Sequence, residues 1–119
     1  MAANLRQFIF ETMENGGCTY NLFAGLSPAT GYAVSILKKQ TTCKADLNSF
    51  TPYFLSAFIK EHAEKLAMPY NFLGSWIDDG QIYLDVVEVT DDLWHAKNVA
   101  RQNNQLAIFD LGKMETIYL

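Results

Sequence analysis

Apolar and polar positions alternate with two different periods along the chain, and each change of period marks a new element. Residues 5–13 carry apolar side chains at helical spacing, which predicts a first helix. The run Asn15-Gly16-Gly17 should end that helix, because Asn and Gly accept the left-handed conformation at a helix C-terminus. Residues 18–23 and 32–37 are rich in β-forming side chains and are predicted to pair as a hairpin across the turn segment 24–31.

The middle of the chain predicts a polar loop, a second helix and another hairpin. Residues 40–50 are polar and are expected to form the loop. Thr51-Pro52 is a typical helix start, since Thr caps a helix and Pro is favoured at its first position. The β-rich runs 71–77 and 81–89 flank Asp78-Asp79-Gly80, and this pattern favours a hairpin because Gly supplies the positive φ of a tight turn.

The last third predicts one more helix and one more hairpin. Thr90 is expected to cap the helix, and the two aspartates that follow it would lie in the first turn, where the helix dipole favours negative charge. The helix should end in the polar run 101–105. Strands at 106–111 and 114–119 would then pair through a two-residue turn at Gly112-Lys113.

Helices and hairpins therefore alternate in the order α-ββ-α-ββ-α-ββ. Because hairpins dominate, we expect an α+β fold in which a mostly antiparallel sheet of hairpins is packed by two or three helices. The chain has 119 residues, of which 50% are hydrophobic. That size and composition suit a single domain over residues 1–119.

The composition narrows the possible partners. The formal net charge is −4, and nucleic acid is not an expected partner, because phosphate contacts need clustered Lys and Arg. Cys18 and Cys43 stand far apart, without the spacing of a metal site, and are expected to be reduced thiols of a cytoplasmic protein. Residues 1–10 do not resemble a secretory signal, and no stretch approaches the roughly 18 apolar residues of a membrane helix, so a membrane is not expected either.

Candidate catalytic and metal sites are weak. The chain has no G-x-S-x-G motif, P-loop or G-x-G-x-x-G motif. His95 could share a helix face with Asp91 or Asp92, but two ligands make a poor metal site, and a surface helix start is the simpler interpretation. Asp85 and Glu88 should lie on opposite faces of one strand, which argues against an acid–base pair. We therefore predict no catalytic residue, no metal and no cofactor, and expect a protein that is not an enzyme.

The polar run 101–105, with the sequence Arg-Gln-Asn-Asn-Gln, has two interpretations. As a helix end it is reasonable, because Arg near a helix C-terminus is favoured by the dipole and Asn accepts the closing left-handed conformation. As a binding site it is also reasonable, because Arg offers a planar fork for phosphates and stacking, while Asn and Gln carry donors and acceptors for a base or a ribose. Trp76 could add a flat stacking surface, although packing is the simpler explanation for any single aromatic residue.

Five segments together resemble a known family. They are N15-G-G-C-T-Y-N-L22, G31-Y-A-V-S-I36, F72-L-G-S-W-I-D-D-G80, I82-Y-L-D-V-V87 and A100-R-Q-N-N-Q-L-A-I-F-D-L111. The chain resembles the phage Thoeris anti-defence sponge proteins of the first type, which bind and sequester cyclic ADP-ribose isomers made by bacterial TIR-domain immune enzymes. The resemblance implies a homo-oligomer with recessed pockets at the subunit interface, acting in the host bacterial cytosol.

The same resemblance implies ligand-binding residues. In that family an aromatic residue and an arginine enclose the adenine, while basic and polar groups hold the pyrophosphate. Arg101 and Trp76 are the corresponding candidates here. Further ligand-binding candidates are Asp85, Asn103 and Asn104.

The chain departs from the family pattern because its only arginines are Arg6 and Arg101. Phosphate contacts would have to come from lysines, with Lys113, Lys38 and Lys39 as the candidates, or the ligand would differ from that of the family. The expected function is sequestration of a cyclic nucleotide immune signal by a phage anti-defence protein, and replacing Arg101 with Ala should then abolish binding. The alternative is a protein–protein inhibitor of a bacterial defence complex such as a CRISPR effector, since acidic inhibitors can occupy nucleic-acid grooves.

Overall fold

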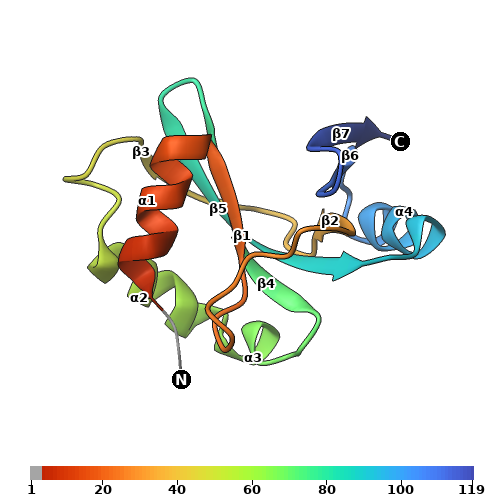
Figure 1. Cartoon of the computed structure of the whole chain (residues 1–119), viewed down its shortest axis with the longest axis horizontal. Coiled ribbons are helices and arrows are strands. Elements are labelled where there is room, and N and C mark those ends of the chain that lie inside the picture. Colours follow the sequence, from red (N-terminus) through yellow and green to blue (C-terminus); the bar gives the residue numbers. More distant parts are fainter. Residues whose placement is uncertain (1–3) are drawn as a thin grey trace.

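The computed structural model describes residues 4–119, so residues 1–3 of the predicted single domain lie outside it. The described chain forms four helices and seven strands (Figure 1). Their bounds are α1 (Leu5–Asn15), β1 (Gly17–Tyr20), β2 (Tyr32–Ser35), β3 (Thr41–Lys44), α2 (Pro52–Glu61), α3 (Ala63–Leu66), β4 (Asn71–Asp78), β5 (Gln81–Thr90), α4 (Leu93–Gln102), β6 (Ala107–Asp110) and β7 (Glu115–Tyr118). None of the helices in residues 4–119 is long and apolar enough to cross a membrane.

The strands form one antiparallel sheet, which confirms the predicted α+β class. The order is β1-β4-β5-β2-β6-β7, and one edge of the long strand β5 is shared by two partners. β3 pairs with residues 81–84 of β5, and β2 pairs with residues 87–90. The β4–β5 hairpin is thus the centre of the sheet, and its Asp79-Gly80 turn has positive φ at both residues.

Two predictions about the first half of the chain are wrong. Residues 18–23 and 32–37 do not pair as a hairpin, because β1 pairs with β4 while β2 lies between β5 and β6. This arrangement covers both edges of the central hairpin, which would otherwise be open to pairing with another chain. The predicted loop 40–50 contains β3, whose polar sequence reflects a short strand with alternate side chains exposed.

Two details of the last third also differ from prediction. Asp92 rather than Thr90 caps α4, and its carboxylate accepts hydrogen bonds from two backbone N–H groups of the first turn, at 2.9 and 3.2 Å. Thr90 is instead the last residue of β5, because its pairing with β2 extends that strand. The final hairpin turns through residues 111–114 rather than through two residues, since the Asp110 carboxylate accepts the Lys113 N–H and organises a wider turn.

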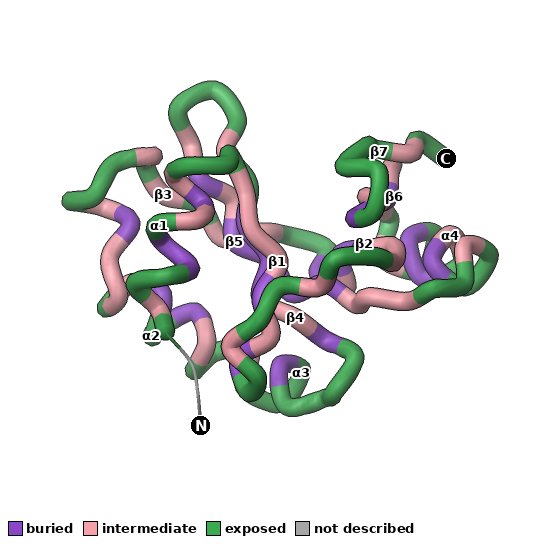
Figure 2. The backbone as a smooth tube through the Cα atoms, viewed as in Figure 1, coloured by how far each residue is buried: buried purple, intermediate pink, exposed green. Residues whose placement is uncertain are grey.

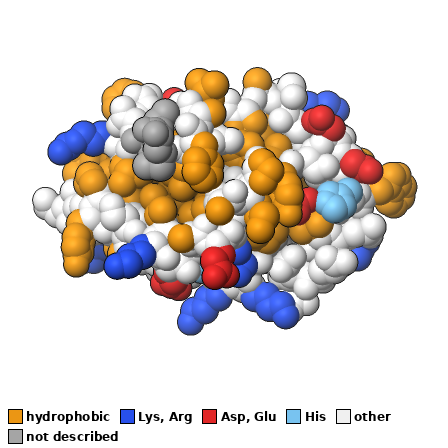
Figure 3. Space-filling model, turned by 90° about the horizontal axis from the view of Figure 1, so that it is seen from below, with side chains coloured by type: hydrophobic (Ala, Val, Ile, Leu, Met, Phe, Trp, Pro, Cys, Tyr) orange, Lys and Arg blue, Asp and Glu red, His pale blue; other side chains and the backbone are white. Residues whose placement is uncertain are grey.

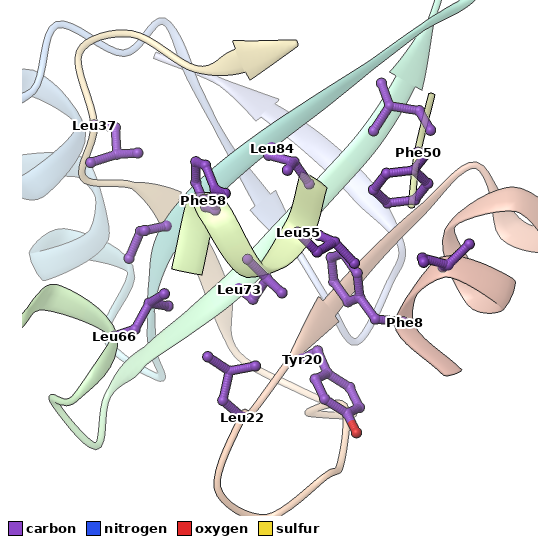
Figure 4. Packing of buried hydrophobic residues seen from close by; sticks show 13 residues of the cluster. Phe8, Tyr20, Leu22, Leu37, Phe50, Leu55, Phe58, Leu66, Leu73 and Leu84 are labelled. Carbon is purple, nitrogen blue, oxygen red and sulfur yellow. The ribbon is translucent and has the colours of Figure 1, made fainter. Parts of the chain in front are cut away.

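The helices cover one face of the sheet. Alternate residues of β5, Ile82 and Leu84 among them, are fully buried beneath α1 and α2. Figure 4 shows Phe8 of α1 and the α2 side chains Leu55 and Phe58 packed over these strands. A second cluster joins α4 to β2 and β6 on the same face: Val34, Ala96, Val99, Ala100 and Ile108. Burial therefore follows the central strands and the inner sides of the helices (Figure 2).

The opposite face of the sheet carries only a small buried cluster of Ala33, Val87 and Leu111. No helix of residues 4–119 packs over the centre of this face. The odd-numbered residues of β5 project there, because side chains of a strand alternate between the two faces. We call this side the open face.

The cap of α2 gives a first testable prediction. Thr51→Ala should lower the free energy of unfolding by about 1 kcal/mol, because the Thr51 side chain accepts the Phe54 N–H at 3.1 Å. Chemical denaturation measures the change. Ser56→Ala is the matched control, since Ser56 is exposed within α2 and Ala is the better helix former. An equal loss in both variants would contradict the capping role.

Candidate functional site

A groove of about 910 Å³ lies between the open face and the β6–β7 hairpin. Its floor includes Gly74 and Asp85 from the central hairpin, together with Ser35 of β2. Trp76 borders one end, and Tyr118 of β7 is among the residues on the hairpin side. Segments far apart in the sequence therefore meet at this single hollow, which we call the sheet groove.

The pairing of β4 with β5 explains the shape of the floor. Gly74 lies directly opposite Asp85, and Trp76 lies opposite Tyr83. Gly74 has no side chain, and the Val87 methyl groups come close to the position that its Cβ would take. A Cβ built on Gly74 would meet a methyl group of Val87 at 3.1 Å and the Asp85 Cβ at 3.8 Å. A glycine inside a strand often marks a close approach by a ligand or another backbone, and Gly74 is among the residues that line the groove.

Trp76, which lines the groove, is stacked on Tyr83. The rings of Trp76 and Tyr83 are stacked, with centroids 5.2 Å apart and an interplanar angle of 6°. Trp76 nevertheless remains 38% exposed. Tyr83 therefore supports the indole from one side, which holds a partly accessible flat surface at the groove.

Asp85 is the buried charge of the groove. The residue is 1% exposed, and within residues 4–119 no Lys, Arg or His forms an ion pair with its carboxyl. Burial raises the pKa of Asp85 to about 6, although hydrogen bonds from Ser35, Val86 and Gln40 partly oppose the shift. A carboxyl group that is buried without a cation favours its neutral form.

The two oxygens of Asp85 have different surroundings. Oδ1 accepts the Ser35 hydroxyl at 2.7 Å and the Val86 N–H at 2.8 Å. Within residues 4–119, Oδ2 accepts a hydrogen bond from Gln40 Nε2 alone, at 3.4 Å, which is long for an N–H···O bond. Oδ1 is thus well satisfied, whereas Oδ2 keeps the capacity to accept another hydrogen bond.

The polar run 101–105 reaches Asp85 indirectly, through Gln105. Gln105 Nε2 donates to the Leu37 carbonyl at 2.9 Å, and the Leu37 N–H donates to Ser35 Oγ at 3.2 Å. The Ser35 hydroxyl has one hydrogen and two possible acceptors, the Asp85 carboxyl and the Leu37 carbonyl at 3.1 Å. The carboxyl is the closer and stronger acceptor, so the hydroxyl donates to Asp85. Gln105 therefore helps to position Asp85 from the start of the β6 segment.

The structure brings together three of the six ligand-binding candidates predicted from the sequence. Trp76, Asp85 and Asn104 line the sheet groove. Asn104 also has φ +57, so it takes the left-handed conformation expected at the end of α4. Gly74 and Gln40 also line the groove but were not predicted from the sequence. The glycine inside a β-rich run was the one available signal for the groove.

The other three candidates lie outside the lining of the sheet groove. Arg101 is exposed on α4, where its guanidinium donates to Asn98 Oδ1 at 3.4 Å. Asn103 closes α4 by donating from its side chain to the Val99 carbonyl at 2.9 Å. Lys113 is exposed in the β6–β7 turn. For Arg101 and Asn103 the local contacts are those of a helix end.

Charges are sparse in the groove. Lys38 is the one basic residue and Asp85 the one acidic residue among the lining side chains of the described chain. The remaining polar groups are neutral, including Ser35, Gln40 and Asn104. Such a surface suits a ligand recognised mainly through hydrogen bonds and stacking, with one cation available for a negative group.

A second, smaller hollow of about 390 Å³ adjoins Tyr70 and His95. His95 Nε2 lies 2.5 Å from Glu88 Oε2, so the partner of this histidine is on β5 rather than at Asp91 or Asp92. Glu88 is on the opposite face from Asp85, as the strand pattern predicts. The hollow is shallow and its histidine is half-exposed, so it offers less enclosure than the sheet groove.

The described residues contain no group of three or more His, Cys, Asp or Glu side chains that could hold a metal ion. Comparison with known proteins gives no family: no family model, curated protein or solved structure matches the chain.

Proposed function

We propose that the protein binds and sequesters a cyclic nucleotide immune signal, a cyclic ADP-ribose isomer, in the sheet groove and without catalysis. The observation that carries the proposal is the groove itself, with a supported indole at one end and a buried carboxyl on the floor. On this proposal the chain acts as a phage anti-defence protein in the host bacterial cytosol. The choice of this ligand comes from the sequence resemblance.

The dimensions and chemistry of the groove support a ligand of this class. Its volume of about 910 Å³ falls within the roughly 300–1,000 Å³ of small-molecule sites. Trp76 can stack on a purine ring, since every base has an aromatic face. The neutral polar groups around Asp85 match ribose hydroxyls and base edges.

Phosphate binding is the demanding part of the proposal. Lys38 is the one cation that lines the groove in the described chain, whereas a pyrophosphate carries two charges. We infer a homo-oligomer in which a second copy adds further contacts beside the β6–β7 hairpin. The exposed side chains Leu106, Met114 and Tyr118, which border the groove, suit such an interface.

Purification from cells with an active TIR-domain enzyme tests the proposal. Denaturing the purified protein should release a cyclic ADP-ribose isomer, detected by mass spectrometry. Trp76→Ala should release less, in line with an affinity about 5- to 150-fold lower, because loss of one stacking contact costs roughly 1–3 kcal/mol. Trp94→Ala is the matched control, since Trp94 is an exposed tryptophan on α4 outside the groove lining. Release of no nucleotide from the wild type would overturn the proposed function.

A protein–protein inhibitor is the second candidate, and an apolar surface supports it. Figure 3 shows a band of hydrophobic side chains across the lower side of the molecule. The large exposed hydrophobic residues include Phe23 and Leu26 before β2, and Met68 and Tyr70 before β4. Recovery of a stoichiometric host protein, with no small molecule retained, would favour this candidate over the sheet groove.

A further inference from the structure

We propose that β7 pairs antiparallel with the β7 strand of a second copy of the chain, so that two sheets join edge to edge around a two-fold axis at Ile117. The inference names an interface for the homo-oligomer invoked above. It rests on the geometry of the strand alone, so it does not depend on which ligand the groove binds.

The strand β7 is an open edge of the sheet. It pairs with β6 on one side, and no strand of residues 4–119 pairs with its other side. Figure 1 shows β7 at the outer end of the sheet. Three of its four residues are exposed: Glu115, Thr116 and Tyr118. An uncovered edge presents N–H and C=O groups that another strand can pair with.

The hydrogen bonds of the β6–β7 hairpin show which backbone groups of β7 point away from β6. The Leu119 N–H donates to the Leu106 carbonyl at 3.0 Å, so Leu119 faces β6. Backbone groups along an antiparallel strand point to alternate sides. Ile117 therefore also faces β6, whereas Thr116 and Tyr118 face outward. The two outward residues offer two N–H donors and two C=O acceptors.

A second copy of the chain fits this pattern. When Ile117 lies opposite its own copy, Thr116 of each chain lies opposite Tyr118 of the other, and every outward group of both residues finds a partner. The two copies of Glu115 are then four positions apart, or about 13 Å along the strands, so these like charges do not oppose each other. An interface that uses the same patch on both subunits is the commonest kind in homo-oligomers.

The surroundings of β7 favour pairing more than those of the other edges. Large exposed hydrophobic side chains gather at the β6–β7 hairpin: Leu106, Met114, Tyr118 and Leu119. β3 also has an unpaired outer side, but it exposes Lys44, and a lysine on an edge strand opposes pairing with another chain. β1 has no exposed residue.

The joined sheet places a side chain of the second copy at the sheet groove. Thr116 and Tyr118 line that groove from β7. Side chains of directly opposite residues on neighbouring strands share one face of a sheet, so the partner's Tyr118 lies beside Thr116 on the groove side. The second copy therefore adds an aromatic side chain to the hairpin wall of the groove.

Mass measurement by light scattering, on the purified protein without ligand, tests the interface. The wild type should be at least a dimer of the 13.4 kDa chain. Thr116→Pro should halve the mass of the wild-type assembly, because proline removes the outward N–H and is tolerated on an edge strand whose N–H faces solvent. The unfolding temperature shows that the variant is folded.

Thr42→Pro on β3 is the matched control. Thr42 is an exposed threonine on an edge strand. Its N–H also points outward, because the Ala45 N–H, three positions on, donates to the Gly80 carbonyl at 3.0 Å at the end of the β3–β5 pairing. This variant should keep the mass of the wild type.

Disulfide cross-linking tests the register without removing a backbone N–H. Ile117→Cys should link two chains under mild oxidation, because directly opposite residues that do not exchange hydrogen bonds have Cα atoms about 4.5 Å apart. Thr116→Cys should not, since its copy lies two positions further along, beyond the roughly 7 Å that Cα atoms of a disulfide can span. Peptide mapping separates this bond from any that involve Cys18 or Cys43.

Three results would overturn the inference: a monomeric wild type, an unchanged mass of Thr116→Pro, or equal cross-linking of the two cysteine variants. None of them depends on a ligand. The release of a nucleotide from the purified protein tests the proposed function separately, so the two can fail independently.

Discussion

Replacing Asp85 with Asn should raise the free energy of unfolding at neutral pH by about 2 to 3 kcal/mol. Burial raises the pKa of the Asp85 carboxyl from its ordinary value of 3.8 to about 6. At pH 7 the folded protein therefore contains an ionised Asp85 carboxylate in surroundings that favour the neutral carboxyl. Asparagine removes the charge and keeps the shape, and its carbonyl oxygen can still accept from Ser35 and Val86.

The pH dependence of this gain has a definite sign. Because the pKa of Asp85 is higher in the folded state, its stabilising effect is fully present below about pH 4 and is lost as the pH rises through about 6. Asn does not titrate, so the advantage of Asp85→Asn should be small near pH 4 and largest above pH 6. Thermal unfolding across this range measures it, with a difference of roughly 10 °C expected at neutral pH.

The comparison needs a second acid, since all carboxyl groups titrate in this range. Asp91→Asn serves as the control, because Asp91 is exposed, and it should change the unfolding temperature little at any pH. If Asp85→Asn destabilised the protein at neutral pH, the carboxylate would stabilise the fold. It would then not be a destabilising group that is kept for ligand binding. A gain in stability with a loss of ligand affinity is the combination expected of a functional group.

Filling the space at Gly74 should have the largest effect on ligand binding. Gly74→Val places a branched side chain directly across from Asp85, on the floor of the groove. A loss of about 5- to 150-fold in affinity is expected from the roughly 1–3 kcal/mol that such crowding costs. Titration calorimetry with a cyclic ADP-ribose isomer measures the loss.

The same substitution should lower the free energy of unfolding by about 1–3 kcal/mol, so the affinity is measured at a temperature where the variant is folded. Valine suits a strand better than glycine does, but its Cβ would lie 3.1 Å from a Val87 methyl group, which must shift to make room. Thr42→Val is the control, because it also introduces a valine into a strand, but at an exposed position of β3 that lies outside the groove lining. Retained affinity in the folded Gly74→Val variant would exclude the floor of the groove as a contact surface.

Local signals in the sequence predicted much of the fold. Asp79-Gly80 predicted the central hairpin, and Thr51-Pro52 predicted the start of α2, because each depends on neighbouring residues alone. The pairing of β1 with β4 depends on contacts between distant segments, and no turn residue specifies it. β3 was missed because an edge strand needs few apolar residues.

The candidate site was harder to predict for the same reason. Trp76 and Asp85 were candidates because one is aromatic and the other is acidic. Their place on a common surface arises from the strand register, which the sequence pattern does not specify. Arg101 was a candidate because it is one of only two arginines, but it lies on the exposed side of α4. Gln105, four residues later, is linked to Asp85 by a chain of hydrogen bonds that begins with its bond to the Leu37 carbonyl and continues through Ser35. No sequence pattern encodes this chain.

The central claim is that the sheet groove, and not the polar run at the end of α4, holds the ligand. Calorimetry of a cyclic ADP-ribose isomer with the wild type, Gly74→Val and Arg101→Ala tests it most directly. The groove predicts that Arg101→Ala binds as the wild type does, while Gly74→Val loses most of its affinity. Loss of binding in Arg101→Ala with unchanged binding in Gly74→Val would contradict the claim and place the ligand at the end of α4.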